Sequence, residues 1–238
     1  MASMTHDLKN PIQSLTGFSQ ALLQGLGGDL TEKQSRFINI INKNANSLHR
    51  MIINLTDYSK IEADKLLVSL ENFNLNDSLN DIKKEIDPLL EKKDYHIEIN
   101  IDSFNTENVY TDKEKFVQIL YNLLYNSIKY TPEGYVRLEI KYPQRDTFNR
   151  LFKKSSNKNI NSYLQVIISD SGKGLSSNDL KNLFNEYVEP DDKSSRRYGI
   201  TGLNLVVSKK LVELLGGFIW VESNISEGVV TSFVIPCE

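Results

Sequence analysis

A long stretch without proline or glycine, Thr31–Lys65, constrains the fold of this chain more than any other feature. Its apolar residues recur every three or four positions, which lines them along one face of a helix: Phe37, Ile41, Ala45, Leu48, Met51 or Ile52, Leu55 and Tyr58. Thr31, followed three residues later by Gln34, is typical of a capping box at a helix start. The stretch therefore predicts one long amphipathic helix.

A shorter helix is predicted before it, from the same spacing of apolar residues at Leu8, Ile12, Leu15, Phe18 and Leu22. The glycine-rich run Gly25–Asp29 separates the two helices, which predicts an antiparallel helical hairpin. Two helices bury too little apolar surface to be stable alone. We therefore predict that two hairpins pair into a four-helix bundle and that the chain is a homodimer.

The pattern changes after the hairpin to alternating strands and helices. We expect helices over residues 76–93, 112–130, 177–185 and 201–215, and strands over 66–70 with Phe73, 96–101, 135–142, 164–169, 218–222 and 231–235. Residues 143–162 are polar and are expected to form a loop. The second part is therefore predicted to be an α+β sandwich with a mostly antiparallel sheet packed against helices.

Composition excludes several classes of protein. The chain has 28 Lys+Arg against 31 Asp+Glu and a formal net charge of -3, which argues against a bulk nucleic-acid binder. The single cysteine, Cys237, excludes an internal disulfide. The longest apolar runs are far below the about 20 residues that span a bilayer, so no membrane contact is expected within this chain.

The segment His6–Pro11 is the first candidate for chemistry. A neutral imidazole is a good nucleophile, and the neighbouring carboxylate of Asp7 can take up or orient its other proton. Asn10 lies four residues after His6, on the same helix face, and its amide could hold a water beside a group bonded to the histidine. The alternative is a surface His-Asp pair at an ordinary helix start.

A second group of polar residues shares one face of the predicted helix over residues 112–130: Asn122, Asn126, Lys129 and Tyr130. Amide oxygens can complete a magnesium shell in which phosphates and waters supply the other ligands, and a lysine two turns along can meet a phosphate. The alternative is a solvated face of an amphipathic helix.

Two glycine-containing segments complete the set. Asp170–Leu175 follows a predicted strand, so its carboxylate could accept a hydrogen bond from an amino group such as that of adenine, while its glycines allow close approach of a flat ring. Gly199–Leu205 leads into a helix N-terminus, a ready anion site, and Lys193, Arg196 and Arg197 precede it. The alternatives are an ordinary turn and a mobile loop with a helix cap.

The order and spacing of these four segments resemble the catalytic part of a two-component sensor histidine kinase. His6–Pro11 resembles the phospho-acceptor box, Asn122–Thr131 the N box, Asp170–Gly174 the first glycine box, and Gly199–Leu205 the second. The resemblance implies a dimerisation and histidine phosphotransfer domain over residues 1–67. It also implies a catalytic ATP-binding domain of the histidine kinase, gyrase and Hsp90 type over residues 68–238.

The resemblance also implies roles for individual residues. His6 would be phosphorylated from ATP, Asp7 would be its general base or orienting group, and Asn10 would support dephosphorylation of a response-regulator receiver domain, the partner that takes the phosphoryl group on an aspartate. Asn126 would coordinate Mg²⁺. The residues placed around the nucleotide are Asn122, Asn126, Lys129, Tyr130, Asp170, Gly172, Gly174, Arg196, Arg197, Gly199, Thr201, Gly202, Leu203 and Thr231.

Two alternatives remain open at this point: an ATPase of the same superfamily, and a catalytically impaired dimeric scaffold that binds nucleotide. Such ATPases carry a glutamate four residues before the metal-binding asparagine, where this chain has Asn122, an amide that cannot act as a base. Ile200 and Asn204 replace glycines that are usual in the second glycine box. We expect a cytoplasmic or plastid stromal location, with any sensor or membrane anchor upstream of Met1.

Overall fold

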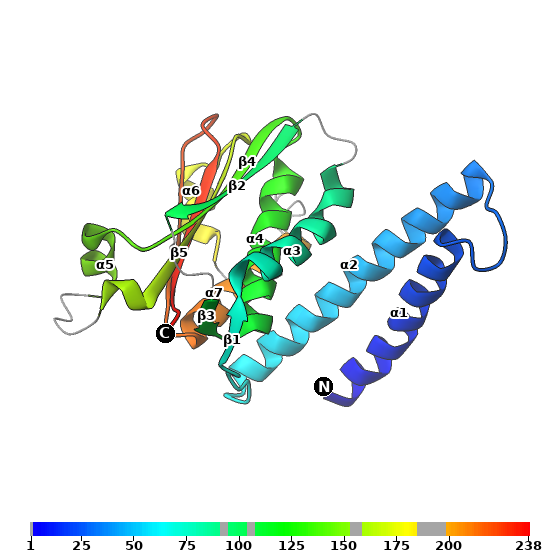
Figure 1. The fold of residues 1–238 in the computed structure, drawn as a ribbon, viewed down its shortest axis with the longest axis horizontal. Coiled ribbons are helices and arrows are strands. Elements are labelled where there is room, and N and C mark those ends of the chain that lie inside the picture. Colours follow the sequence, from blue (N-terminus) through cyan, green and yellow to red (C-terminus); the bar gives the residue numbers. More distant parts are fainter. Residues whose placement is uncertain (1, 91–94, 104–107, 153–158, 185–198) are drawn as a thin grey trace. The chain divides into compact units, whose positions relative to one another are not determined.

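The computed structural model describes residues 2–90, 95–103, 108–152, 159–184 and 199–238, although the side chains of residues 2–7, 88, 95–96, 101–103 and 199–201 lie outside this description. The chain divides into two compact units, Met1–Leu66 and Leu67–Glu238. Figure 1 shows the helical first unit in blue and cyan, and the mixed second unit in the remaining colours.

The first unit is the predicted helical hairpin, made of α1 (Ala2–Leu23) and α2 (Glu32–Glu62). The capping box is present: the Thr31 hydroxyl accepts from the Gln34 backbone N–H at 3.3 Å, and the Gln34 side chain accepts from the Thr31 N–H at 2.9 Å. The Asn42 amide on α2 donates to the Ser19 hydroxyl on α1 at 2.8 Å. This hydrogen bond fixes the register of the two helices.

Much of the apolar face of the hairpin is exposed. Phe18 is 74% exposed, and the other large apolar side chains exposed on the two helices are Leu8, Leu15, Leu22, Phe37, Ile40, Ile41, Leu48 and Leu55. An exposed apolar stripe of this length is typical of an interaction surface. None of the helices in the described part of the chain is long and apolar enough to cross a membrane.

The second unit combines strands and helices. Its elements in chain order are β1 (Glu71–Asn74), α3 (Leu75–Leu90), β2 (Tyr95–Ser103), β3 (Asn108–Thr111), α4 (Lys113–Tyr130), β4 (Gly134–Lys141), α5 (Arg145–Leu151), a 3₁₀ turn η1 (Ile160–Ser162), β5 (Tyr163–Asp170), α6 (Ser177–Asn182), α7 (Gly199–Leu214), β6 (Phe218–Ser223) and β7 (Val229–Pro236).

The main sheet has the strand order β2-β4-β5-β7-β6, and a separate two-stranded sheet pairs β1 with β3. The β2–β4 pairing is parallel, whereas β4–β5, β5–β7 and β6–β7 are antiparallel. This confirms the predicted mostly antiparallel sheet of an α+β sandwich.

The core lies between one face of this sheet and the helices α4 and α7. Alternate residues of β5, namely Leu164, Val166 and Ile168, are fully buried on that face. The ring of Phe116 on α4 meets the ring of Phe233 on β7 edge to face, with centroids 6.4 Å apart. This packing holds the first turn of α4 against β7.

The opposite face of the sheet differs from the prediction. Residues 143–162 were expected to be a loop, but they include the helix α5, which lies on the side of the sheet away from α3 and α4 (Figure 1). Phe148 and Phe152 pack against Tyr163 and Phe218, with ring centroids 4.6–5.1 Å apart. Seven polar-rich residues form a helix here because these tertiary aromatic contacts stabilise it.

The strands near the start of the unit also differ. The first strand is Glu71–Asn74, which includes the predicted Phe73 but not Leu66–Leu70, and β3 was not predicted. Both short strands are stabilised by long-range pairing, since β1 pairs with β3 and the Tyr110 N–H of β3 donates to the Cys237 carbonyl at 3.0 Å.

Candidate functional site

Two amides on the polar face of α4 are buried rather than solvated. Asn122 is 3% exposed and Asn126 is 8% exposed, which argues against the interpretation as a solvated helix face. Both polar atoms of the Asn126 amide are buried and have no hydrogen-bond partner among the described residues. Leaving a buried amide unpaired costs about 1–3 kcal/mol per group, so this position calls for a polar ligand or ion.

The amide of Asn122 lies one turn earlier and has a partner on another helix. Its Nδ2 donates to the hydroxyl of Ser208 on α7 at 3.4 Å, and Ser208 is fully buried. Ser208 had no place among the predicted site residues, because the contact joins positions 86 residues apart.

Two further residues of the predicted face are more exposed. Lys129 is exposed and Tyr130 is half-buried at the end of α4, and the Lys129 ammonium lies 5.3 Å from the centroid of the Tyr130 ring. The four residues therefore form a gradient along α4, from the buried amides to a cation near the surface.

Asp170, the last residue of β5, is a buried carboxylate with many donors around it. Its Oδ1 accepts from the N–H groups of Gly172 at 3.0 Å and Val229 at 3.3 Å, and the hydroxyls of Ser127 and Thr131 also stabilise its ionised form. Burial nevertheless raises the pKa of Asp170, because desolvation outweighs these favourable contacts. Ser127 and Thr131 were missed from the sequence, although both lie within the N box.

A side chain would not fit at either glycine after Asp170. A Cβ at Gly172 would lie 2.9 Å from the Asp170 carboxylate and 3.1 Å from the Tyr130 carbonyl. Gly174 has a φ of +70°, and a Cβ there would collide with the backbone of Asn224, in the turn between β6 and β7. Gly174 is thus required by close approach of protein backbone, whereas Gly172 borders the carboxylate itself.

Thr231 lies on β7 and shares a sheet face with Asp170. In the β5–β7 register, Asp170 pairs with Val229 and Ile168 pairs with Thr231. Ile168 lies two residues before Asp170 on the same face of β5, so Thr231 is a diagonal neighbour of Asp170 on that face. It is buried. Asp170, Thr231, Ser127 and Thr131 therefore surround one end of the space between the sheet and α4.

The second glycine segment begins α7. The helix starts at Gly199, and a Cβ at Gly202 would meet no neighbouring atom among the described residues. Gly202 and Leu203 are half-buried. The side chain of Thr201 and the whole of Arg196 and Arg197 lie outside the described residues.

His6, Asp7 and Asn10 lie on α1, which continues through Pro11. The side chains of His6 and Asp7 lie outside the described residues, while Asn10 is exposed and its backbone carbonyl accepts from the Ser14 hydroxyl at 3.1 Å. Pro11 has no N–H, so the backbone carbonyl four residues earlier, that of Asp7, lacks its usual helical donor.

Comparisons with known proteins agree with this arrangement. The sequence model of the family described as histidine kinase-, DNA gyrase B-, and HSP90-like ATPase matches residues 111–238, and that of the His Kinase A (phospho-acceptor) domain matches residues 1–64. The autoinducer 2 sensor kinase/phosphatase LuxQ of Vibrio vulnificus (strain YJ016) is 29% identical over 238 residues, which cover 100% of this chain and 26% of LuxQ. The chain belongs to the sensor histidine kinase family.

Solved histidine kinase structures share the fold. Full-length ShkA in complex with AMPPNP matches with a TM-score of 0.68 and 18% identity, over 99% of this chain and 45% of that one. The histidine kinase ThkA in complex with the response regulator protein TrrA matches with a TM-score of 0.59 and 22% identity, over 100% of this chain and 60% of that one. The chain spans about a quarter of the length of the curated relatives it matches.

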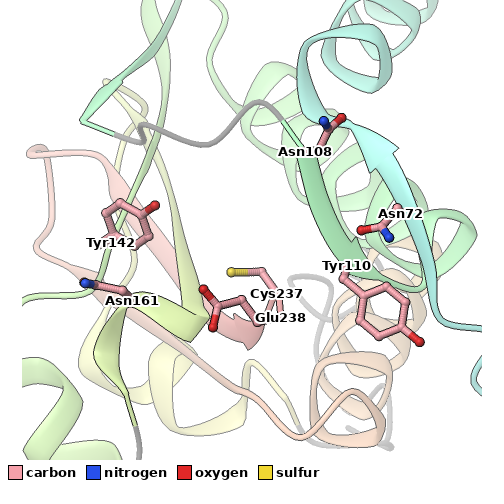
Figure 2. A pocket seen from close by; sticks show the side chains of 7 residues that line it. All are labelled: Asn72, Asn108, Tyr110, Tyr142, Asn161, Cys237 and Glu238. Atoms are coloured by element: carbon pink, nitrogen blue, oxygen red, sulfur yellow. The ribbon is translucent and has the colours of Figure 1, made fainter.

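One cavity of the second unit is lined by none of the predicted site residues. It has a volume of about 440 Å³ and is lined by Asn72, Asn108, Tyr110, Tyr142, Asn161, Cys237 and Glu238. Figure 2 shows the Cys237 sulfur pointing into it between Tyr142 and Tyr110. Burial raises the pKa of this thiol to about 12, so it is protonated and unreactive at neutral pH.

Proposed function

We propose that this chain is the catalytic core of a sensor histidine kinase, which phosphorylates His6 from ATP and passes the phosphoryl group to an aspartate of a response-regulator receiver domain. The observation that carries the proposal is the pair of buried polar groups in the second unit, the unpartnered Asn126 amide and the Asp170 carboxylate. Both lie within the segment that matches the ATPase family.

Asp170 would select the base of the nucleotide. An ionised carboxylate accepts from the exocyclic amine of adenine, and Gly172 has no Cβ that would crowd the carboxylate. Gly174 would frame the same site while it packs on the backbone of Asn224, and Thr231 would lie behind the adenine. Both glycines therefore serve the shape of the site.

Asn126 would hold Mg²⁺ through its amide oxygen, a hard ligand that suits this ion, and its lack of a partner among the described residues fits that role. When bound, the ion would neutralise charge on the phosphate oxygens. Asn122, Lys129 and Tyr130 would line the same side of the nucleotide, where the exposed Lys129 ammonium would approach a phosphate.

The start of α7 would receive the phosphates. Backbone N–H groups at a helix N-terminus attract anions, and Gly199, Thr201, Gly202 and Leu203 form the first turns of this helix. Arg196 and Arg197 precede it in sequence and would neutralise the terminal phosphate. Ile200 and Asn204, which replace glycines usual in the family, would tune the closure of this segment.

In the phosphotransfer step an imidazole nitrogen of His6 would attack the γ-phosphorus in line, as the bond to the bridging oxygen breaks and ADP leaves. Asp7 would orient the imidazole and take the proton of its other nitrogen. The phosphoryl group would then move from His6 to an aspartate of the receiver domain. Asn10 would position a water that hydrolyses the phosphoryl group of the receiver domain. This second activity is in keeping with the kinase/phosphatase name of LuxQ.

We assign residues 1–67 to dimerisation and histidine phosphotransfer, and residues 68–238 to ATP binding. The exposed apolar face of the hairpin supports a homodimer through a four-helix bundle. The proposed substrates, ATP and a receiver domain, fit a reaction in the cytoplasm.

Incubation with γ-labelled ATP and Mg²⁺ tests the proposal. The protein should acquire an acid-labile, base-stable label that His6→Gln abolishes while ATP binding is retained. His49→Gln is a matched control, because His49 lies on the other helix of the hairpin, and it should keep the label. Label that persists in His6→Gln would refute the assignment of the phosphorylated residue.

The same assay separates the alternatives. A superfamily ATPase would release phosphate continuously without labelling the protein, and an impaired scaffold would bind nucleotide and do neither. The amide of Asn122, bonded to Ser208, cannot take a proton from water, which favours transfer to His6 over hydrolysis.

A further inference from the structure

A buried hydrogen-bonded link connects α4 with α7. The Asn122 Nδ2 on α4 donates to the Ser208 Oγ on α7 at 3.4 Å, and both residues are more than nine-tenths buried. The two helices pack against each other. A polar contact in such surroundings keeps its geometry, because no water is available to replace either partner.

Asn122 is the donor and Ser208 the acceptor in this hydrogen bond, because the Ser208 hydroxyl has only one proton. The Ser208 hydroxyl has one proton, and it donates that proton to the Asn204 carbonyl at 2.8 Å. The lone pairs of Ser208 are therefore left to accept, and they accept from the Asn122 amide nitrogen. As a consequence, Asn122 turns its nitrogen toward α7 and its oxygen away from Ser208.

The link joins the two helices that carry most of the proposed nucleotide site. Asn122 lies one turn before Asn126, on the same face of α4, and Asn126 is the buried amide without a partner among the described residues. Ser208 and Asn204 lie on α7, which begins with the second glycine segment at Gly199. Any shift of α7 along α4 would disturb the orientation of the Asn122 amide.

We propose that Ser208 is a positioning residue of the magnesium–nucleotide site, which acts by orienting the Asn122 amide and by holding the start of α7 in register with the Asn126 side chain. This inference rests on the proposed function, because it assigns Ser208 a role in a site that the proposal defines. Ser208 itself contacts neither ion nor nucleotide.

Removal of the hydroxyl tests the inference. Ser208→Ala deprives the buried Asn122 nitrogen of this acceptor and removes one constraint on the orientation of the amide. Calorimetric titration with AMPPNP should show roughly tenfold weaker binding in the presence of Mg²⁺, the size of effect expected for the loss of one buried hydrogen bond. Binding in EDTA should change by less than roughly twofold, because Asn126 then has no ion to hold.

Ser78 provides a matched control. It is also fully buried within a helix, and its hydroxyl donates to the Asn74 carbonyl four residues earlier, at 3.3 Å. Ser78→Ala thus removes the same buried group from α3, away from Asn122, and should leave the Mg²⁺-dependent gain in affinity unchanged. An equal loss in Ser78→Ala and Ser208→Ala would overturn the inference, since general destabilisation would then explain both.

A double-mutant cycle shows whether Ser208 acts through Asn122. In an Asn122→Ala background, Ser208→Ala should weaken Mg²⁺-dependent binding no further, whereas additive effects would contradict the inference. Ser208→Thr keeps the hydroxyl and should restore the Mg²⁺ dependence. In the protein without ligand, the side-chain amide NMR signal of Asn122 should move in Ser208→Ala and remain in place in Ser78→Ala.

The outcomes separate this inference from the proposed function. A wild-type chain that binds AMPPNP more tightly with Mg²⁺, and a Ser208→Ala variant that does so equally, would overturn the role of Ser208 alone. A wild-type chain that binds no nucleotide under either condition would overturn both proposals together.

Discussion

In the helical hairpin the unusual residues are apolar side chains that are exposed, whereas in the α/β unit they are polar side chains that are buried. Phe18 leaves 74% of its surface in solvent on α1, although phenylalanine is among the residues most often buried. Asp170 is 5% exposed on β5, although aspartate is rarely buried without partners. The hairpin, which is the first unit, therefore exposes apolar side chains that usually lie in a core. The α/β unit, which is the second unit, buries polar side chains that usually lie at a surface.

This difference indicates the kind of partner each unit lacks. Exposed apolar residues are stabilised by another apolar surface, and a second hairpin supplies one with matching spacing. A buried amide such as that of Asn126 and a buried carboxylate such as that of Asp170 call for polar atoms or an ion, which the proposed nucleotide with Mg²⁺ would supply. Under the proposed function, each unit would thus be completed by a different class of molecule.

The largest expected effect comes from placing a charge on the hairpin face. Phe18→Glu should raise the dissociation constant of the dimer by at least roughly 100-fold, because a buried phenylalanine contributes about 1.5–3 kcal/mol and a symmetric dimer buries two. Sedimentation equilibrium over a concentration series measures this constant.

A matched control comes from the α/β unit. Ile225 is 70% exposed, close to the exposure of Phe18, but it lies at the turn between β6 and β7. Ile225→Glu should leave the dimer intact. If both substitutions leave the dissociation constant unchanged, the exposed face of the hairpin is not the dimer interface and the comparison between the units fails on that side.

The next effect concerns the buried carboxylate. Asp170→Asn keeps the shape and an oxygen acceptor for the Gly172 and Val229 N–H groups, but it removes the charge. Nucleotide affinity should fall by roughly 10- to 100-fold, since hydrogen bonds to charged groups contribute about 1.5–3 kcal/mol. Fluorescence titration with a labelled ATP analogue measures the loss, and Asp146→Asn, an exposed change on α5, should have none.

Asp170→Asn should lower nucleotide affinity but should not lower the free energy of unfolding at neutral pH. Because burial raises the pKa of Asp170, the folded state holds this proton more tightly than the unfolded state does. The contribution of Asp170 to the free energy of unfolding therefore decreases as pH rises from the ordinary carboxyl pKa of 3.8 through the raised value. Urea titrations at several pH values should show Asp170→Asn without this slope and at least as stable as wild type at pH 7.

A marked loss of stability in Asp170→Asn at pH 7 would contradict this account. It would mean that the carboxylate stabilises the fold, and its burial would then need no ligand to explain it. Retention of stability with loss of nucleotide affinity would instead support a group kept for binding.

Local sequence patterns predicted the helices and the main strands well. The spacing of apolar residues located α2, and the Thr31–Gln34 pair located its first turn, because both signals act within a few residues. The alternation of Val136, Leu138 and Ile140 located β4 for the same reason. Local signals were sufficient wherever the stabilising partner was near in sequence.

Predictions failed where the stabilising partner is distant. β3 depends on β1 and on the Cys237 carbonyl, and α5 depends on Tyr163 and Phe218, none of which a local pattern can indicate. The residues of the candidate site divide in the same way, into those that a local pattern indicates and those that depend on a distant partner. Asp170 and Asn126 stood out as residue types at strand and helix positions, but Ser127, Thr131 and Ser208 became visible only after α4 was packed against the sheet and α7.

The smallest expected effect compares one local motif in both units. The Thr31–Gln34 capping box begins α2, and a second box begins α6, where the Ser176 hydroxyl accepts from the Asp179 N–H at 3.2 Å and the Asp179 carboxylate accepts from the Ser176 N–H at 3.2 Å. Thr31→Ala and Ser176→Ala each remove a cap that contributes about 1 kcal/mol.

Their consequences should differ because the two units are stabilised differently. Thr31→Ala weakens the long helix of the hairpin, so it should lower a melting transition that depends on protein concentration, as expected when folding is coupled to dimerisation. Ser176→Ala affects a six-residue helix at the edge of a unit with its own core, so it should leave that concentration dependence unchanged. Thermal melts at several protein concentrations compare the two. An identical, concentration-independent shift in both variants would show that the hairpin is stable without a second copy, and that its exposed apolar face has another use.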